Sequence, residues 1–203
     1  RDWSSDVCSS DLTVGSTSFQ PDWVWTKSRS AATDNKITDS VRGVTNALIT
    51  SSTAAQTTDA GGVTAFNSNG FTVGTTAAYN TNAATYIGWQ WKCNAGTTAS
   101  NTNGSITSTV QVNATSGFSI LTYTGTAANA TVGHGLGVAP SMIIVKFKST
   151  TSNWSVYHAS VGNTGRLQLN LTDATQTASS YWNNTSPTSS VFTIGSKIGR
   201  AHV

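Results

Sequence analysis

The chain has 203 residues, of which only 9% are charged, and it contains no glutamate. The net charge is +3, but the few cations form no cluster, which argues against a nucleic-acid partner, and no apolar run approaches the roughly 18 residues of a membrane-spanning helix. The hydrophobic content of 37%, with seven Trp, five Tyr and six Phe, is enough for a packed core and excludes a disordered chain. Since β-branched and turn-forming residues outnumber strong helix formers, we predict an almost all-β protein.

The two ends of the chain read as opposite strands of one oligonucleotide. One set of codons for residues 198–203 has a reverse complement that translates as the sequence of residues 6–11. We therefore interpret 1–12 and 197–203 as translated sequencing adapter, non-native, and exclude them from fold prediction. Without Cys8, Cys93 has no disulfide partner, and we expect it to pack as a small apolar side chain.

Short strands bounded by turn residues are predicted along the first half of the chain. They lie at 22–27, 37–41, 47–50, 70–74 and 86–92. In the last of these, Ile87, Trp89 and Trp91 share one face, and their hydrophobicity predicts that this face is buried. The stretch 94–104, rich in Gly, Thr, Ser and Asn, is typical of a linker.

The second half continues the same pattern of short strands separated by turns. Strands are predicted at 106–112, 118–124, 142–147, 154–158, 167–171 and 191–194. The Gly-rich segment 129–138 is predicted to be a loop, and the nearly continuous apolar run 142–147 to be a central strand covered on both faces. This spacing favours an antiparallel β-sandwich over alternating βα units.

Parts of the sequence occur twice, in the same order. The matches are 21–27 with 140–146, 40–41 with 160–161, and 71–74 with 192–195, at spacings of 119, 120 and 121 residues. An internal repeat indicates a modular, arrayed architecture. We therefore predict two tandem copies, 13–93 and 105–196, joined by the linker 94–104.

Each copy is expected to be incomplete. The first lacks a counterpart of 118–123, and the second lacks a counterpart of 86–91. We expect the copies either to pack together and cover these gaps or to leave an exposed edge that is prone to aggregation.

Several segments together resemble a repeated domain of the tail and tail-fibre proteins of tailed phages. Residues 117–126 (GFSILTYTGT), 132–140 (VGHGLGVAP), 143–146 (IIVK) and 154–158 (WSVYH) carry the resemblance, and 19–27 (FQPDWVWTK) with 39–43 (DSVRG) resemble its partner half. The resemblance extends over nearly all of 13–196. It implies a sandwich similar to the concanavalin-like, jelly-roll-like lectins and a structural or host-recognition component of the virion, and it supplies no catalytic residues.

Chemistry-bearing residues are few, so we predict that the protein is not an enzyme and holds no metal or cofactor. His134 and His158 have no nearby partners for a metal site and are expected to make structural hydrogen bonds. The Gly-rich run 132–137 lacks the Lys and the following helix of a phosphate-binding loop. The carboxylates Asp22, Asp34, Asp39, Asp59 and Asp173 lie in or beside turns, where aspartate bonds the backbone.

The segment Tyr181, Trp182 and Asn183 is the predicted ligand-binding site. An exposed aromatic ring beside amide groups can stack on a sugar and bond its hydroxyls. The alternative is that Trp182 plugs the end of the sandwich. We also leave two functions open: a phage-tail module whose partners are other tail proteins, copies of itself and host surface glycan, or a carbohydrate-binding or adhesive module of a secreted, extracellular bacterial protein.

Overall fold

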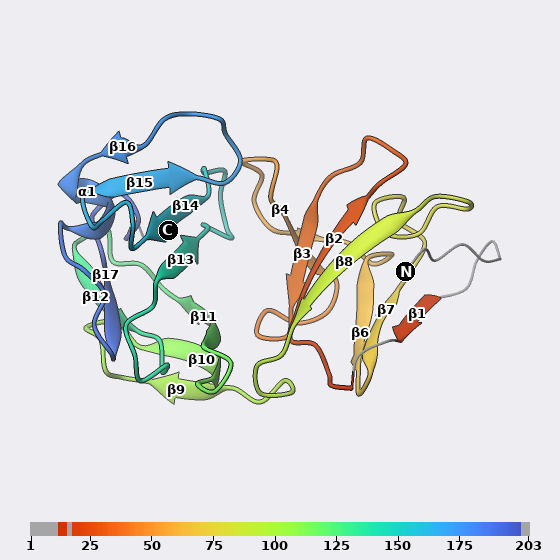
Figure 1. Ribbon diagram of the computed structural model, residues 1–203, viewed down its shortest axis with the longest axis horizontal. Helices are drawn as coiled ribbons and strands as arrows, with labels where there is room; N and C mark the ends of the chain where they lie inside the picture. The colour runs from red at the N-terminus through yellow and green to blue at the C-terminus, as the bar shows by residue number, and fades with distance from the viewer. Residues whose placement is uncertain (1–11, 16–17, 200–203) are drawn as a thin grey trace.

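Antiparallel strands build almost the whole molecule (Figure 1). The computed structural model describes residues 12–15 and 18–199. Within them lie seventeen strands and one short helix, α1 (Ser179–Trp182), arranged as two modules side by side. All pairs of named strands are antiparallel, so the predicted all-β, sandwich-like fold is confirmed.

The first module is a sandwich of two sheets. One has the order β5-β4-β3-β2-β8, formed by β2 (Trp23–Ser28), β3 (Lys36–Asp39), β4 (Asn46–Ile49), β5 (Thr57–Thr58) and β8 (Tyr86–Trp91). The other has the order β1-β7-β6, formed by β1 (Leu12–Gly15), β6 (Val63–Asn67) and β7 (Gly70–Val73). Val24 of β2 packs against Phe71 and Val73 of β7, so the core lies between the two sheets.

The second module repeats this plan with one sheet in each layer. The sheet β13-β14-β15-β16 contains β13 (Met142–Val145), β14 (Ser155–His158), β15 (Gly165–Gln168) and β16 (Gln176–Thr177). The opposing pair is β12 (Ala130–Gly133) with β17 (Val191–Ile194). Trp182 and Ile194 are fully buried in the core between them, together with Tyr157 and Phe192.

A third sheet, β11-β10-β9, packs on the second module beside β12, where Ser108 Oγ donates to Gly133 O and Ser119 Oγ donates to His134 O. It consists of β9 (Ala99–Asn101), β10 (Ser108–Asn113) and β11 (Phe118–Tyr123). Leu121 and Tyr123 pack against the core of the second module. At the other end of β11, Phe118 stacks on Trp23 of the first module, with ring centroids 5.4 Å apart. The segment predicted as a plain linker, 94–104, thus contains a strand and leads into a sheet that contacts both modules.

The strand registers show that the sequence repeat is a structural repeat. Trp23 lies opposite Asp39, and 119 residues later Met142 lies opposite His158. The same spacing relates β3 with β4 to β14 with β15, and β4 with β5 to β15 with β16. Each pair of neighbouring strands in the sheet β13-β14-β15-β16 therefore has a counterpart, in the same register, in the larger sheet of the first module.

The alignment of 40–41 with 160–161 at a spacing of 120 is wrong by one residue. Gly43 (φ 88°) and Gly162 (φ 83°) occupy the same left-handed turn position, which requires a spacing of 119. The spacing rises to 121 only at β7 and β17, because α1 and the loop after it replace β6 and its hairpin turn.

Two details differ from the sequence prediction. The segment 129–138 is not entirely loop, because Ala130 and Val132 alternate as core residues of β12. The run 142–147 is not a central strand: β13 pairs only with β14 among the described strands. Its apolar character comes from burial on both faces, since Ile143 and Val145 contact the module core while Ile144 contacts the first module.

Residues 197–199 belong to the packed structure, although they were excluded as adapter. Ile198 is buried in the core of the second module, and Lys197 N donates to Ser180 O over 2.9 Å. In the first module, Thr76 N donates to Gly61 O in the same way over 3.0 Å. The other residues interpreted as adapter, except Leu12 in β1, lie outside the described residues.

Candidate functional site

The two modules meet through the outer faces of their larger sheets. On β2, Val24 points into the module core, so the neighbouring Trp side chains point outward. Ile37, Leu48 and Trp154 form a buried cluster between the modules. Partly buried side chains surround it: Trp23, Trp25, Ile144 and Leu169. Because Trp154 comes from the second module and the other two from the first, the interface is a hydrophobic core of its own.

Hydrogen bonds fix the relative position of the two modules at this interface. Trp154 Nε1 donates to Ile49 O over 2.9 Å. Backbone amides also cross the interface, from Gln56 to Lys148 O (2.8 Å) and from Ser152 to Thr53 O (2.9 Å). Because hydrogen bonds are directional and apolar burial is not, these contacts define the orientation of one module relative to the other.

The chain segment between the modules is held by a fully buried carboxylate. Asp22 accepts hydrogen bonds from the amides of Cys93 (2.7 Å), Ala95 (3.0 Å) and Gly96 (2.7 Å). Burial raises the pKa of the neighbouring Cys93 thiol to about 12, with the negative charge of Asp22 adding to the effect. Cys93 therefore packs as a neutral side chain, as predicted, and Asp22 makes backbone contacts as expected for a turn aspartate.

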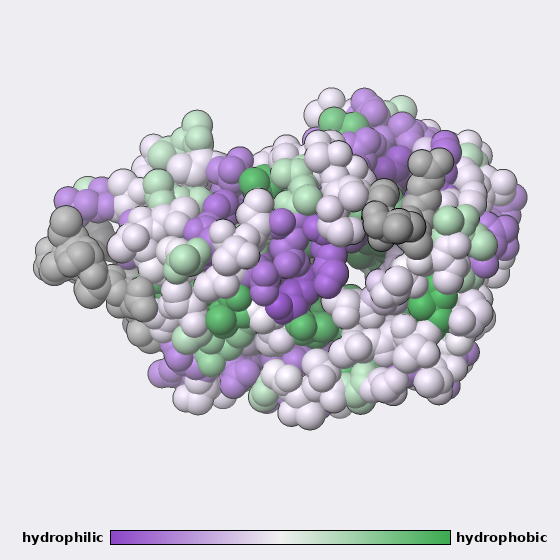
Figure 2. All heavy atoms as spheres, turned by 180° about the vertical axis from the view of Figure 1, so that it is seen from behind, coloured by the Kyte–Doolittle hydropathy of each residue, from purple (hydrophilic) through white to green (hydrophobic). Residues whose placement is uncertain are grey.

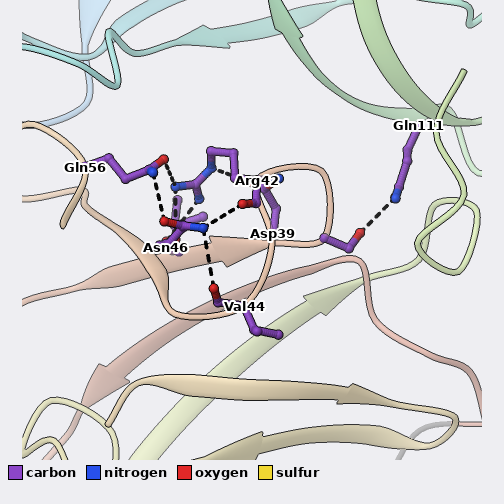
Figure 3. Close-up of polar contacts among 8 residues, drawn as sticks. Asp39, Arg42, Val44, Asn46, Gln56 and Gln111 are labelled. Carbon is purple, nitrogen blue, oxygen red and sulfur yellow. Dashed lines mark hydrogen bonds and ion pairs between the residues drawn. The ribbon is translucent and has the colours of Figure 1, made fainter. Parts of the chain in front are cut away.

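A polar network around Arg42 supports the first module beside the interface (Figure 3). Its guanidinium pairs with Asp39 (2.5 Å), and both side chains are nearly buried. Arg42 also donates to Asn46 O (3.0 Å) and to Gln56 Oε1 (3.1 Å). Since the amide of Gln56 reaches Lys148 of the second module, this network links the turn after β3 to the interface.

A groove of about 390 Å³ opens where the two modules meet. Its lining combines one indole ring, two aliphatic side chains and several amides and hydroxyls: Trp25, Asn35, Thr50, Ser51, Leu169, Asn170, Leu171 and Thr172. Residues 50–51 and 169–170 are counterparts in the repeat, so equivalent segments of the two modules face each other across the groove. We call this the intermodule groove.

An exposed tryptophan lies beside the intermodule groove. Trp89 of β8 is 43% exposed, and its ring centroid lies 5.6 Å from that of Trp25. Leu171, on the groove wall, is also exposed. Figure 2 shows the back of the molecule, where hydrophobic residues form separate patches among hydrophilic ones rather than one continuous area. Near the groove, Trp89 and Leu171 thus expose apolar surface next to the amide and hydroxyl groups of the lining.

The prediction that the Ile87, Trp89 and Trp91 face of β8 is buried is wrong. The opposite face points into the module, where Tyr86 is buried, while Ile87 and Trp89 are exposed. The prediction from hydrophobicity failed because Tyr86 packs in the core, where its hydroxyl donates to Ala77 O and accepts from Thr81 N. Trp89, which the hydrophobic alternation assigns to the core, is the residue in the sequence that signals the groove.

The predicted ligand-binding residues lie elsewhere and do not form an exposed platform. Trp182 is 1% exposed, and its Nε1 donates to Gly165 O over 3.0 Å, so it plugs the second sandwich, which is the alternative considered above. Tyr181 is buried and donates to Gln176 Oε1 over 2.8 Å. Asn183 caps α1 in a left-handed conformation and accepts a bond from Asn129 Nδ2 over 2.9 Å. Trp182 thus offers no ring face to a sugar.

His134, which was considered as a metal ligand, has a structural role. Within the described residues, no group of three or more His, Cys, Asp or Glu side chains could hold a metal ion. The buried His134 accepts from Leu136 N through Nδ1 and contacts Thr188 O through Nε2, both over 3.1 Å. Burial lowers the pKa of His134, which favours the neutral ring that can accept the bond from Leu136 N.

Comparison with known proteins gives one family and no individual relative. The model of a family described as "Domain of unknown function (DUF7483)" matches residues 5–202. No curated protein and no solved structure matches the chain significantly. Among the described helices, none is long and apolar enough to cross a membrane.

Proposed function

Because the chain belongs to the DUF7483 family, whose description assigns no activity, we propose its function from its own architecture: it is a repeat-built structural module of a phage tail that contacts host surface glycan through the intermodule groove. In this proposal the protein is part of the virion, its partners are other tail proteins or copies of itself, and it catalyses no reaction. We propose a phage tail because segments of the chain resemble tail-fibre repeats, and glycan as the ligand because of the residues that line the groove.

The observation that carries the proposal is the pairing of Trp25 and Trp89 beside amide and hydroxyl groups. A sugar ring presents an apolar face that stacks on an indole and a rim of hydroxyls that need hydrogen-bond partners. The amide of Asn170 already accepts from Trp154 N and donates to Asn153 Oδ1, both over 2.9 Å. The hydroxyls of Ser51 and Thr172, on the two walls of the groove, supply further donors and acceptors. The groove therefore has the two kinds of group that a neutral saccharide requires, in one place.

The carbohydrate-binding module of a secreted bacterial protein is the second candidate, and the same groove supports it. The two candidates share the ligand class and differ in the assembly that carries the module. Neighbouring genes for tail and baseplate proteins favour the phage tail, whereas genes for secretion or sugar use favour the secreted protein.

Trp89→Ala is expected to weaken glycan binding roughly tenfold or more, because it removes the exposed stacking surface. The experiment is a screen of the protein against a glycan array and extracts of bacterial surfaces, followed by titration of the best ligand with the wild type and the variant. Because Trp89 is largely exposed, its replacement should leave the unfolding midpoint nearly unchanged.

Val138→Ala is the matched control. Val138 is also an exposed hydrophobic residue, but it does not line the intermodule groove, so its replacement should leave binding intact. If the wild type binds no glycan in any extract, or if Trp89→Ala binds as well as Val138→Ala does, the proposed role of the groove is wrong.

A further inference from the structure

A row of aromatic rings leads from the intermodule groove along the larger sheet of the first module. Its rings come from β8, the last strand of that sheet, and from the neighbouring β2. Trp89 lies opposite Trp25, which lines the groove, and Trp91 lies opposite Trp23. The ring centroids are 5.6 Å apart in the first pair and 4.6 Å apart in the second, and the two rings of β2 are 6.2 Å apart. We call these four residues the tryptophan row.

The end of the tryptophan row that lies away from the groove reaches β11. The ring of Phe118 stacks on Trp23 and on Trp91, with centroid distances of 5.4 Å and 6.0 Å. The turn 114–117, which directly precedes Phe118 in the chain, is exposed and carries the hydroxyls of Thr115 and Ser116. Polar groups therefore lie at both ends of the row, those of the groove at one end and those of this turn at the other.

The two rings of β8 are the accessible half of the tryptophan row. Trp89 is 43% exposed, and Trp91 is partly exposed. Residues two positions apart on a strand point to the same side and are about 7 Å apart, so these indoles are successive parts of one surface. Ile87, also exposed, extends the same face beyond Trp89. A ligand that lies along β8 can therefore contact Trp89 and Trp91 one after the other.

The two rings of β2 hold the accessible rings in place. Trp23 and Trp25 pack against the buried cluster of Ile37, Leu48 and Trp154 between the modules. Each ring of β8 in turn contacts one of these packed rings. Because the accessible rings are already ordered, a ligand that stacks on them costs little side-chain entropy.

The chemistry of the tryptophan row suits a neutral chain of sugars. Among the residues of β2 and β8, only Lys27 is charged, and its Nζ already donates to Thr33 O over 2.9 Å. Sugar rings have apolar faces that stack on indoles, and their hydroxyls can bond the polar groups at the two ends of the row. Several rings in succession offer stacking surface to several linked sugars, whereas a single terminal sugar would use one.

We propose that the tryptophan row binds a linear, neutral oligosaccharide. One sugar lies at the groove on Trp89, and later sugars of the same chain stack on Trp91 towards Phe118. This ligand class rests on the proposed binding of glycan in the groove and narrows it to an internal stretch of a polysaccharide. Trp91 is then the residue that makes the affinity depend on the length of the chain.

The experiment is isothermal titration calorimetry of the full chain with β-1,4-linked oligomers of glucose and of N-acetylglucosamine, each from the disaccharide to the hexasaccharide. In at least one series the hexasaccharide should bind roughly tenfold or more tightly than the disaccharide, because the second indole adds a stacking contact. Trp91→Ala should abolish this gain and leave the affinity for the disaccharide within about twofold. Trp89→Ala should weaken the binding of both.

Two further variants serve as controls. Trp91→Phe keeps an aromatic ring against Trp23 and should keep part of the gain with length. Val138→Ala changes an exposed residue outside the tryptophan row and should keep all of it. Circular dichroism verifies that each variant is folded.

Equal affinity for the disaccharide and the hexasaccharide, or a gain with length that persists in Trp91→Ala, would overturn the assignment of the row while leaving glycan binding in the groove intact. Failure of both series to bind would also overturn it, and the glycan array then decides separately whether the proposed function fails as well. Self-association of the chain that Trp91→Ala abolishes, measured by analytical ultracentrifugation, would assign the row to a second copy and contradict the proposal.

Discussion

Replacing Trp154 by Ala is expected to lower the free energy of unfolding by about 3–5 kcal/mol, the usual cost of truncating a large buried aromatic residue. Trp154 is the centre of the hydrophobic cluster between the modules, and its indole N–H is bonded to Ile49 O across the interface. The substitution should also let the modules unfold separately. Urea denaturation followed by circular dichroism should show one cooperative transition for the wild type and a broadened or two-step transition for Trp154→Ala.

Trp154→Phe separates the two contributions of this side chain. It keeps most of the buried apolar surface and removes the N–H donor, so it should cost only about 1–3 kcal/mol, since Ile49 O loses its partner. A Trp154→Ala variant that unfolds in one transition of unchanged midpoint would show that the interface contributes nothing to stability.

Arg42→Ala is expected to destabilise the first module by about 3–5 kcal/mol, because it leaves the buried Asp39 carboxylate without its charge partner. The bonds to Asn46 O and Gln56 Oε1 are lost at the same time. Thermal unfolding by differential scanning calorimetry measures the effect.

The repeat itself provides the control for Arg42. Val161 is its counterpart in the second module at the spacing of 119, and Val161→Ala removes no ion pair. Its expected cost is within about 1 kcal/mol. If the two variants lose similar stability, the Arg42 network is not a major support of the first module.

The fold class and the repeat could be predicted because both depend on local pattern. Alternation along 22–27 and the turn residues after it reproduce β2, and the match of 21–27 with 140–146 reproduces the register of β2 and β13. What the pattern could not show is which strand lies beside which. The strand β13 looks central from its sequence because the first module covers its outer face, a contact between residues about 100 positions apart in the chain.

The candidate site could not be predicted from the sequence for a related reason. Trp182 and Trp89 are equally hydrophobic, and both have polar neighbours in the chain. Trp182 is buried because a helical turn directs it between the two sheets, whereas Trp89 is exposed because Tyr86 occupies the inner face of the same strand. The strands and helix packed around each tryptophan determine whether its side chain is buried. A single sequence does not show which elements these are.

The central claim, that the intermodule groove binds glycan through its tryptophans, is tested most directly by fluorine NMR of protein labelled with 5-fluorotryptophan, titrated with the glycan found in the screen. The resonances of Trp25 and Trp89 should shift with saturation, while that of Trp182, buried in the second module, should stay fixed. A shift of the Trp182 resonance with no change at Trp25 and Trp89 would contradict the claim.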